Sequence, residues 1–475
     1  MPEIDINAVQ SAPLPGQLLD IAGKIRAEGG ESYIVGGWVR DCLLGISSSN
    51  YDLEIYGIEL DSLANILSRY GRPKTVGRAF GVVTMDIGGE SYDFAFPRTE
   101  SKIGKGHKGF MVKPDPCLTY EEAAARRDFT VNSMGLRVPE LELVDPHGGV
   151  ADLKAGILRH VSDAFGEDPL RALRAVQFSA RFTMDIDPET QKLCAVQPLE
   201  ELPPERIYQE FRKLLLKADK PSIGLEWMKK MDLLRYFPEL KALIGVQQDP
   251  EWHPEGDVWE HNNRVVDEAA LIRDRDIKDE ETDSEFERMS LMLGALCHDF
   301  GKPGTTVLKD GHWRSPAHEA EGEKHARSFL ARITRDQRLI SRVVAYVREH
   351  LKPALYYKVR NEIKPSAIRR LSLRVDIDKL VRMARADHFG RTTQDALERR
   401  FEAGDWLLEQ SRQLNVLDQK PKPILTGKML LSLGMKPGPR MGQIIGESFE
   451  LQLDNKLTSQ EDVLEWAKDR LKGES

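Results

Sequence analysis

The sequence predicts an α+β protein, in which a head containing a small mixed sheet precedes an all-helical body. Four short runs rich in β-branched and aromatic residues lie before residue 100, each bounded by glycine, serine or proline. After about residue 163 such runs nearly vanish, and long segments rich in Leu, Arg, Glu and Ala repeat apolar residues with a 3.6-residue period. These two observations separate the head from the body.

The composition sets limits on the class of protein. Of the 475 residues, 40% are hydrophobic and 30% charged, which excludes a disordered chain. No apolar run reaches the roughly 18 residues of a membrane-spanning helix, and the N-terminus lacks a signal sequence, so we expect a cytoplasmic protein without a membrane partner. The four scattered cysteines argue against a disulfide framework. Because the net charge is −8, contact with nucleic acid requires local basic patches.

The elements of the head follow from local patterns. The predicted strands are residues 33–35, 51–56, 81–87 and 91–96. A helix is expected to open after the first strand and end at Gly45, and another to end near Arg126. In the body, breaks are expected at Pro203-Pro204, Pro238, Pro254, the charged run 273–287 and the segment 419–423.

A first group of chemical residues surrounds the first two strands. Gly36 and Gly37 lie between a strand and a helix, where backbone N–H groups can approach a polyphosphate, and Arg40 is placed to pair with a phosphate oxygen. Asp52 and Glu54 lie two residues apart on one strand, so both point to one face, and Asp93 lies on another strand. Paired acids repel each other, and divalent metal ions shared with substrate phosphates give a reason for them. An acidic outer face of an edge strand is the alternative.

A second group follows at the start of the helical part. Asp168, Arg171 and Arg174 are spaced three apart, so on a helix they share a face. Such a spacing is commonly a salt bridge, and it also suits a pair of side chains that reads a nucleobase edge.

Five ordered motifs connect these groups to a known family. They are Gly36–Asp41 with Asp52–Glu54, Arg126–Asn132, Val144–Gly149, Glu167–Arg171, and Pro204–Ile207 with Glu210. In this order they resemble the class II tRNA nucleotidyltransferases, which include CCA-adding enzymes and bacterial poly(A) polymerases. Two positions depart from the family pattern: Glu54 stands where Asp is usual, and Gln177 where Arg is frequent.

The resemblance implies a polymerase-β-like head and a set of roles. Asp52 and Glu54, with Asp93, would hold Mg²⁺ for attack of an RNA 3′-hydroxyl on the α-phosphate. Nucleotide contacts would come from Gly36, Gly37, Arg40 and Arg127 to the triphosphate, Asp128 to the ribose, and Asp168, Arg171 and Arg174 to the base. The basic, glycine-rich stretch 98–110 would be a mobile flap near the site.

The body carries a series of possible metal ligands: His261, His298, Asp299, His318, His350 and Asp387. A lone histidine is usually structural, but this ordered series resembles the HD-domain phosphohydrolases, which implies a transition-metal ion that activates water. We expect His253 to line the substrate site, and His312 and His325 to be surface residues.

Four domains are therefore expected: a nucleotidyltransferase head (1–160), a helical neck (161–245), an HD domain (246–395) and a tRNA-binding tail (396–475). The predicted function is addition of CCA to tRNA from CTP and ATP, with a second phosphohydrolase activity. A poly(A) polymerase, a CC-only or A-only adding enzyme, and an inactive RNA-binding module are the alternatives. The terminus lacks the strongly basic extension usual in poly(A) polymerases, and intact acids argue against the inactive module.

Overall fold

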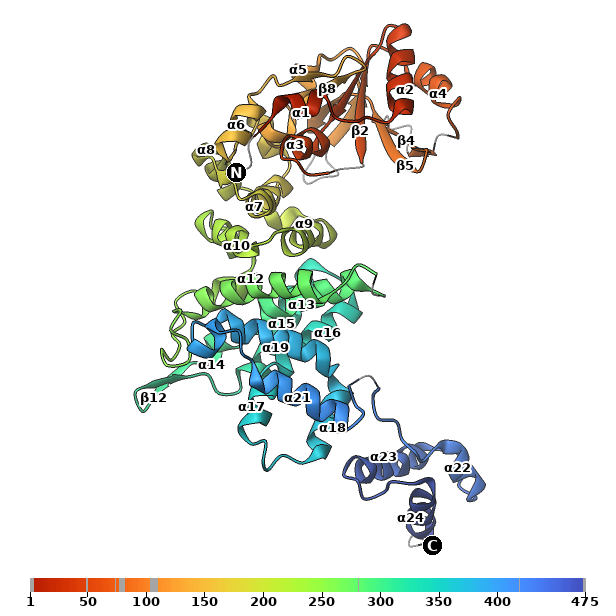
Figure 1. The fold of residues 1–475 in the computed structure, drawn as a ribbon, viewed down its shortest axis with the longest axis vertical. Coiled ribbons are helices and arrows are strands. Elements are labelled where there is room, and N and C mark those ends of the chain that lie inside the picture. Colours follow the sequence, from red (N-terminus) through yellow and green to blue (C-terminus); the bar gives the residue numbers. More distant parts are fainter. Residues whose placement is uncertain are drawn as a thin grey trace. The chain divides into compact units, whose positions relative to one another are not determined.

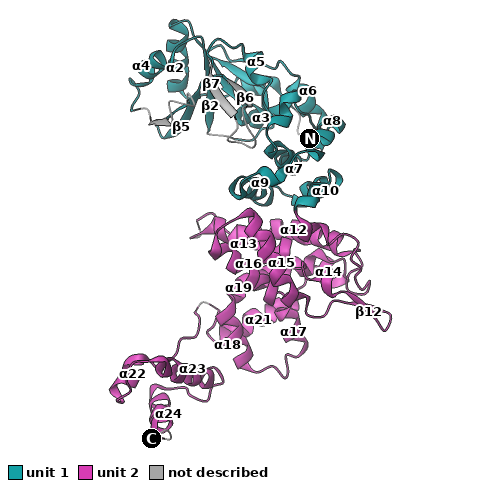
Figure 2. Ribbon diagram, turned by 180° about the vertical axis from the view of Figure 1, so that it is seen from behind, with its two compact units in different colours: residues 1–236 teal, residues 237–475 magenta. Residues whose placement is uncertain are grey.

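The computed structural model describes residues 4–47, 50–72, 74–76, 82–102, 110–280, 282–417 and 419–472. They form two compact units, residues 1–236 and 237–475 (Figure 2). The first is α+β and the second is almost entirely helical (Figure 1), as the sequence predicts.

The first unit is built on a seven-stranded mixed sheet with the order β3-β4-β5-β2-β1-β8-β9. Its strands are β1 (Glu31–Val35), β2 (Tyr51–Tyr56), β3 (Lys74–Val76), β4 (Val82–Ile87), β5 (Glu90–Ala95), β8 (Gly135–Val138) and β9 (Glu142–Val144). The four predicted strands correspond to β1, β2, β4 and β5. Only β2 and β5 run parallel within this sheet.

The alternation of side chains along β2 explains its place in the sheet. Tyr51, Leu53 and Ile55 are buried, whereas Asp52 and Glu54 are only partly covered. Because successive side chains point to opposite faces, the apolar set enters the core and both acids face the other side. The prediction that the two acids share one face is confirmed.

The helices of the first unit are α1 (Ile6–Gln10), α2 (Gly16–Ala27), α3 (Gly37–Leu43), α4 (Leu60–Leu67), α5 (Tyr120–Ala124), α6 (Gly149–Ala155), α7 (Leu170–Phe182), α8 (Pro188–Ala195), α9 (Pro204–Lys217) and α10 (Pro221–Lys230). Two short strands, β10 (Ile157–Leu158) and β11 (Asp185–Ile186), pair in parallel. A capping box between Thr119 and Glu122 sets the start of α5.

Two predicted helix ends differ from the structure, and the stretch predicted as a flap contains a strand. The helix expected to reach Gly45 ends at Leu43, and the helix expected to end near Arg126 ends at Ala124. In the stretch predicted as a flap, Arg98–Lys102 forms strand β6, which pairs with β7 (Phe110–Pro114), and residues 103–109 lie outside the described residues.

The second unit contains α11 (Pro238–Lys241), α12 (Val258–Asp276), α13 (Ser284–Cys297), α14 (Lys302–Thr305), α15 (His318–Ile333), α16 (Gln337–Glu349), α17 (Lys352–Lys358), α18 (Pro365–Arg374), α19 (Ile377–Gly390), α20 (Gln394–Leu397) and α21 (Glu402–Gln413), with a hairpin of β12 (Val307–Lys309) and β13 (His312–Arg314). α12 packs against α13 and α19, and α15 packs against α16 (Figure 1). Asp257 caps α12 by accepting a hydrogen bond from the backbone N–H of Glu260.

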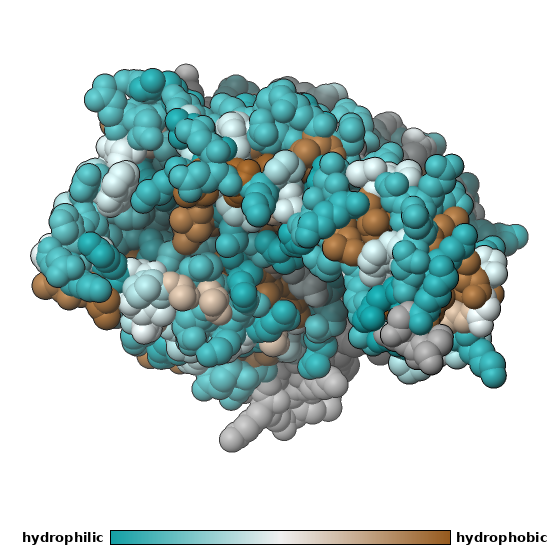
Figure 3. Space-filling view, turned by 90° about the horizontal axis from the view of Figure 1, so that it is seen from below, coloured by the Kyte–Doolittle hydropathy of each residue, from teal (hydrophilic) through white to brown (hydrophobic). Residues whose placement is uncertain are grey.

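The last helices, α22 (Gly427–Ser432), α23 (Pro439–Leu453) and α24 (Gln460–Lys472), share a small core of their own that includes Leu430, Ile444 and Val463. The face drawn in Figure 3 is mostly hydrophilic, with apolar side chains in separate patches. Among the described residues, every helix is too short or too polar to cross a lipid bilayer.

A close backbone approach fixes the turn between α13 and α14. An ideal Cβ on Gly301 would lie 2.0 Å from the carbonyl oxygen of His318 and 2.6 Å from the backbone nitrogen of Gly322. Only a residue without a side chain allows α15 to begin this close to the turn.

We predict that Gly301→Ala destabilises the protein by about 1–3 kcal/mol, because the new methyl group overlaps rigid backbone. Gly304→Ala is the matched control three residues away, where the nearest atom to a new Cβ is the flexible Glu321 side chain at 4.0 Å. Thermal and urea unfolding of the full chain measure both. Equal stability of the two variants would contradict this account of the turn.

Candidate functional site

The parallel pairing of β2 and β5 places Asp52 directly opposite Asp93. Burial, the neighbouring Asp93 and Glu54 together raise the pKa of Asp52, against the opposing effect of Arg127. The hydroxyl of Thr84 donates a hydrogen bond to Asp93 Oδ1 at 2.6 Å. The three carboxylates therefore meet on one face of the sheet, where their repulsion favours a bound cation.

Glu54 is held on both of its oxygens. Arg127 Nη2 lies 3.0 Å from Glu54 Oε1, and the Tyr56 hydroxyl donates to Glu54 Oε2 at 2.9 Å. Gly36 has a φ of 73°, and an ideal Cβ there would lie 3.8 Å from Asp52 Oδ2. The glycine turn therefore passes directly beside the acids, as expected from the sequence.

Arg40 is less exposed than the sequence suggests. Its side chain is buried, forms an ion pair with Asp41 and donates a hydrogen bond to Asn132 Oδ1. Its guanidinium also lies over the rings of Phe178 and Phe182, 5.0 and 4.5 Å from their centroids. Arg40 thus links α3 to α7 as well as facing the cavity described below.

Asp128 and Arg174 form a buried pair. Arg174 Nε donates to Asp128 Oδ2 at 2.6 Å, while the Asn132 amide and the Phe129 N–H donate to Oδ1. Although burial disfavours the charged carboxylate, Arg174 and these hydrogen bonds lower the pKa of Asp128. Asp128 is therefore ionised and fixed in position.

The prediction that Asp168 lies on the same helix as Arg171 and Arg174 is wrong, because α7 begins only at Leu170. Asp168 instead accepts a hydrogen bond from the N–H of Leu170 at 3.1 Å and pairs with Arg206 at 2.7 Å. The N–H groups of a helix's first turn have no partner within the helix, so the Asp168 carboxylate satisfies one of them from outside the helix.

Arg171 also has partners that a position on a shared helical face does not predict. It donates to the backbone carbonyls of Ala164 and Arg126, at 2.6 and 2.7 Å. Asp168, Arg171 and Arg174 still converge, because all three line the same cavity.

That cavity has a volume of about 630 Å³. It is lined by every residue of the head and neck to which the sequence assigns a role: Gly36, Gly37, Arg40, Asp52, Glu54, Asp93, Arg127, Asp128, Asp168, Arg171 and Arg174. Asn132, Arg181 and Arg206, to which the sequence reasoning assigned no contact with the nucleotide, also line it. Arg206 lies inside the fifth motif, and that position in the sequence could have identified it as a site residue. Burial lowers the pKa of Arg181 to about 10.

A second cluster occupies the interior of the second unit. His261, His298 and Asp387 form one buried group with ligand atoms close together, and Asp299, His318 and His350 form another. The six residues come from α12, the end of α13, α15, the end of α16, and α19. Asp299 joins the groups, because Oδ2 lies 3.2 Å from His298 Nε2 and Oδ1 lies 3.4 Å from His318 Nε2.

In three of the four histidines, the contact made by Nδ1 shows that Nε2 is an acceptor. The Nδ1 atoms of His298, His318 and His350 lie 2.7–2.9 Å from backbone carbonyl oxygens. A carbonyl only accepts, so Nδ1 carries the proton and the Nε2 of a neutral ring offers a lone pair. Burial lowers the pKa of His318 and, to about 3, that of His350, whereas Asp299 raises the pKa of His298 despite burial.

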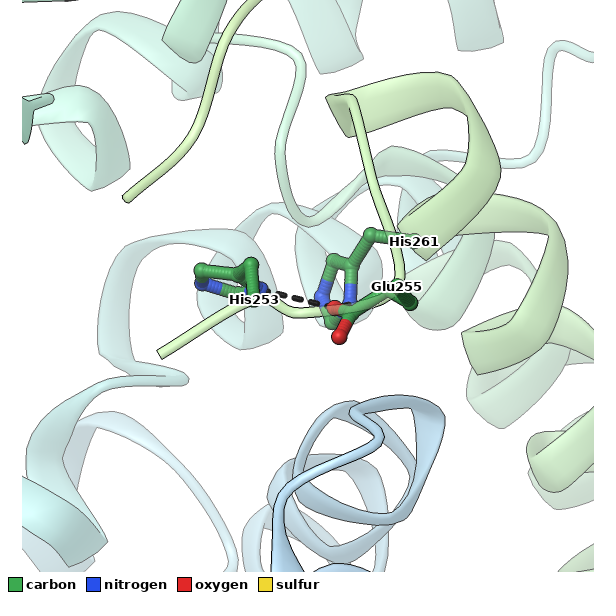
Figure 4. Close-up of side chains that lie close together, drawn as sticks. All are labelled: His253, Glu255 and His261. Atoms are coloured by element: carbon green, nitrogen blue, oxygen red, sulfur yellow. Dashed lines mark hydrogen bonds and ion pairs between the residues drawn. The ribbon is translucent and has the colours of Figure 1, made fainter. Parts of the chain in front are cut away.

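Glu255, which the sequence reasoning missed, contacts the remaining histidine of the cluster, His261 (Figure 4). Its Oε1 lies 2.8 Å from His261 Nδ1 and 2.9 Å from His253 Nδ1. Since a carboxylate orients a ligating histidine in many metal sites, this contact is the expected support for a metal ligand. In the sequence, Glu255 stands two residues after His253, and no spacing pattern distinguishes it from other acidic residues.

An open cavity of about 260 Å³ lies beside this cluster and is lined by His253, Asp299, His318, His350 and Asp387, among others. His253, expected to line the substrate site, lines this cavity. His312 and His325 are surface residues, as predicted, with about half of each side chain exposed (56% and 42%).

Comparison with known proteins identifies two family models. The Poly A polymerase head domain matches residues 32–159, and the "Probable RNA and SrmB- binding site of polymerase A" matches residues 183–244. Among solved structures, the CCA-adding enzyme of Bacillus stearothermophilus in complex with CTP covers 96% of this chain and 97% of its own, with a TM-score of 0.64 and 20% identity. That likeness shows a shared fold.

Two relatives are similar in sequence over most of their length. The Multifunctional CCA protein of Xylella fastidiosa (strain 9a5c) is 37% identical over 331 residues, which are 68% of this chain and 74% of the relative. That of Xanthomonas campestris pv. campestris (strain B100) is 36% identical over 372 residues, 74% and 85% of the two chains. This similarity shows that the chain belongs to the class II CCA-adding enzyme family, alongside the multifunctional CCA proteins.

Proposed function

We propose that this protein is a cytoplasmic tRNA nucleotidyltransferase that adds CCA to tRNA 3′ ends from CTP and ATP. One observation carries the proposal: the opposed carboxylates of Asp52 and Asp93 share a cavity with the Asp168, Arg171 and Arg174 side chains. One bound nucleotide would then contact both the metal-binding acids and the side chains that read its base. The relatives named Multifunctional CCA protein support the choice of reaction.

Family membership implies the use of a divalent metal ion, and we propose Mg²⁺ held by Asp52, Glu54 and Asp93. The residues fit, because the three carboxylates line the same cavity and the pKa of Asp52 is raised by burial and by its acidic neighbours. When bound, Mg²⁺ neutralises charge on the triphosphate and makes the RNA 3′-hydroxyl a better nucleophile for attack on the α-phosphate. Arg127 holds Glu54 in place.

The other residues of the cavity position the nucleotide. The Gly36-Gly37 turn leaves room for phosphates beside Asp52, and Arg40 and Arg127 supply positive charge. Asp128, kept ionised by Arg174, is placed to accept a hydrogen bond from the ribose. These contacts orient the triphosphate for in-line attack.

Base selection is assigned to Asp168 and Arg171. Arg206 holds both oxygens of Asp168, at 3.2 and 2.7 Å, so the carboxylate is a fixed acceptor. Cytosine and adenine both carry an exocyclic amino group that can donate to it, whereas UTP lacks this donor and GTP presents a carbonyl in its place. The Arg171 guanidinium donates to ring or carbonyl acceptors.

We also propose a phosphohydrolase site in the second unit, with a transition-metal ion bound by His261, His298, Asp299, His318, His350 and Asp387. Two features of the donor set support it. His298 Nε2 is buried and faces the Asp299 carboxylate at 3.2 Å, and the Nδ1 atoms of His298, His318 and His350 already contact backbone carbonyl oxygens. When bound, such an ion activates water for attack on a phosphoester.

The first prediction concerns Asp52. Asp52→Asn keeps the shape but removes a metal-binding charge, so we expect nucleotide addition to fall at least a hundredfold with little change in stability or tRNA binding. Addition is measured on tRNA lacking its last three nucleotides, with Asp86→Asn on β4 as the control for an exposed acid of the same sheet. If Asp52→Asn adds nucleotides as fast as the parent, the metal site does not depend on this strand. Product length separates CCA addition from two-nucleotide or one-nucleotide addition and from a long A tail.

The second prediction concerns base choice. Asp168→Ala is expected to slow addition and to weaken discrimination against UTP and GTP by about 5- to 150-fold, since an unpaired acceptor costs roughly 1–3 kcal/mol. Arg171→Ala should do the same with a larger loss of rate. Single-nucleotide addition with each triphosphate measures this, with Asp163→Ala as a neighbouring acid that does not line the cavity. If both variants reject UTP and GTP as sharply as the parent, the base is read elsewhere.

The third prediction separates the two sites. His298→Ala and Asp299→Ala should each lose bound transition metal and phosphohydrolase activity while CCA addition stays within about twofold, because the two sites use different compact units. Metal content by mass spectrometry and both activities are measured, with the exposed His325→Ala as the control. Loss of CCA addition in a folded variant would show that the sites are not independent.

A further inference from the structure

Glutamate and tyrosine pair two residues apart on three neighbouring strands of the sheet in the first unit. In each pair the tyrosine is buried and its hydroxyl donates a hydrogen bond to the glutamate carboxylate, at 2.6–2.9 Å. The pairs are Glu31 with Tyr33 on β1, Glu54 with Tyr56 on β2, and Glu90 with Tyr92 on β5. Among the described residues, only the pair on β2 reaches the cavity of about 630 Å³, through Glu54. Its tyrosine is therefore the one placed to act on the candidate metal site.

The Tyr56 hydroxyl is fixed by the packing of its ring. Tyr56 is 5% exposed and packs edge-on against Tyr33, with ring centroids 5.3 Å apart, in a small cluster that includes Tyr120 of α5. Tyr33 and Tyr120 stack at 4.6 Å, and the Tyr120 hydroxyl donates to the Ser133 carbonyl at 3.0 Å. The cluster therefore joins β1, β2 and α5 beside the acids.

The same cluster sets the position of Arg127. Ala124, at the end of α5, is a fully buried member of it, and the Ala124 carbonyl accepts a hydrogen bond from the Arg127 N–H at 3.0 Å. Arg127 Nη2 lies 3.0 Å from Glu54 Oε1, while the Tyr56 hydroxyl donates to Glu54 Oε2 at 2.9 Å. Both oxygens of Glu54 are thus held by side chains that one packed cluster orients.

Glu54 needs this support more than the other two acids of the site. A glutamate side chain has one more rotatable bond than Asp52 or Asp93, and the freedom that it loses on binding an ion opposes binding. Hydrogen bonds to both oxygens remove that freedom before the ion arrives. Each carboxylate oxygen offers about two lone-pair sites, so one site on each oxygen remains for the ion.

We infer that Tyr56 is a positioning residue: its hydroxyl orients Glu54 and so raises the affinity of the site for a divalent cation. This role rests on the proposed Mg²⁺ site and extends it to a residue that is not among the described lining residues of the cavity. Hydrogen-bond partners of metal ligands typically change metal affinity or activity about 10- to 100-fold when they are removed. Tyr56 acts through Glu54 and has no assigned contact with the ion or the nucleotide.

The test measures metal affinity separately from activity. Metal-free, full-length protein is titrated with Mn²⁺, and free Mn²⁺ is followed by electron paramagnetic resonance. The part of the binding that Asp52→Asn loses belongs to this site. Tyr56→Phe keeps the ring and should weaken that part at least about tenfold, and raise the Mg²⁺ concentration for half-maximal addition by a similar factor. The kcat at saturating Mg²⁺ should stay within about twofold of the parent, since the ion then fills the site.

Two matched variants control for packing and for the loss of a hydroxyl. Tyr33→Phe removes a hydroxyl from the same aromatic cluster, and Tyr92→Phe removes the equivalent hydrogen bond on the neighbouring strand. Each of these hydroxyls donates to a glutamate that is not among the described lining residues. Both variants should therefore bind Mn²⁺ within about twofold of the parent.

A double-mutant cycle tests whether Tyr56 acts through Glu54. Glu54→Asp shortens the arm by one C–C bond, about 1.5 Å, which takes the carboxylate out of hydrogen-bond range of the Tyr56 hydroxyl. In that background, Tyr56→Phe should change the Mn²⁺ affinity by less than about twofold.

The outcomes separate this role from the function on which it rests. Unchanged Asp52-dependent Mn²⁺ affinity in Tyr56→Phe would overturn the inference and leave the nucleotidyltransferase assignment intact. An equal loss of affinity with Glu or Asp at position 54 would do the same. So would a loss that follows the loss of folded protein in a thermal scan, since Tyr56 would then act through packing. If Asp52→Asn alters neither Mn²⁺ binding nor addition, the proposed metal site falls and the role of Tyr56 falls with it.

Discussion

The parallel pairing of β2 with β5 is the constraint on which the first unit depends. It sets Asp52 against Asp93 and leaves Glu54 on the same face, an arrangement that mutual repulsion and partial burial both oppose. The surrounding contacts offset this cost. Arg127 pairs with Glu54, and Thr84 donates to Asp93. A bound cation would offset the remaining repulsion.

In the second unit, by contrast, the ionisable groups of the histidine cluster are almost completely buried. Each of the four ligand-type histidines has its Nδ1 atom committed to a fixed partner, a carbonyl for three rings and Glu255 for His261. The inner nitrogens are then oriented without any choice of tautomer. Gly301 makes this possible, because the absence of a side chain lets the start of α15, with His318, approach the turn that follows Asp299.

Local patterns in the sequence predict much of this arrangement, and long-range contacts account for the rest. Strands β1, β2, β4 and β5 and the shared face of Asp52 and Glu54 follow from spacing over a few residues. The histidine series, which extends from His261 to Asp387, was instead implied by a family resemblance. Strands β8 and β9 were missed, because β8 pairs with β1, which lies about 100 residues earlier in the chain, and β9 pairs in turn with β8. The position of Asp168 was wrong for a similar reason. Its carboxylate caps α7 and pairs with Arg206, a partner that no helical spacing reveals.

Charge is the property for which the whole-chain average is least informative. The protein carries a net charge of −8, yet the described residues that line the larger cavity include eight arginines and five carboxylates. No lysine is among them. Arginine stays charged when buried and presents a planar fork that matches phosphate and carboxylate oxygens, so it can pair with Asp128 or Asp168 and still face a ligand. An acidic chain can therefore hold a polyanionic substrate, because the attraction depends on side chains within a few ångströms and solvent screens the distant surface charge.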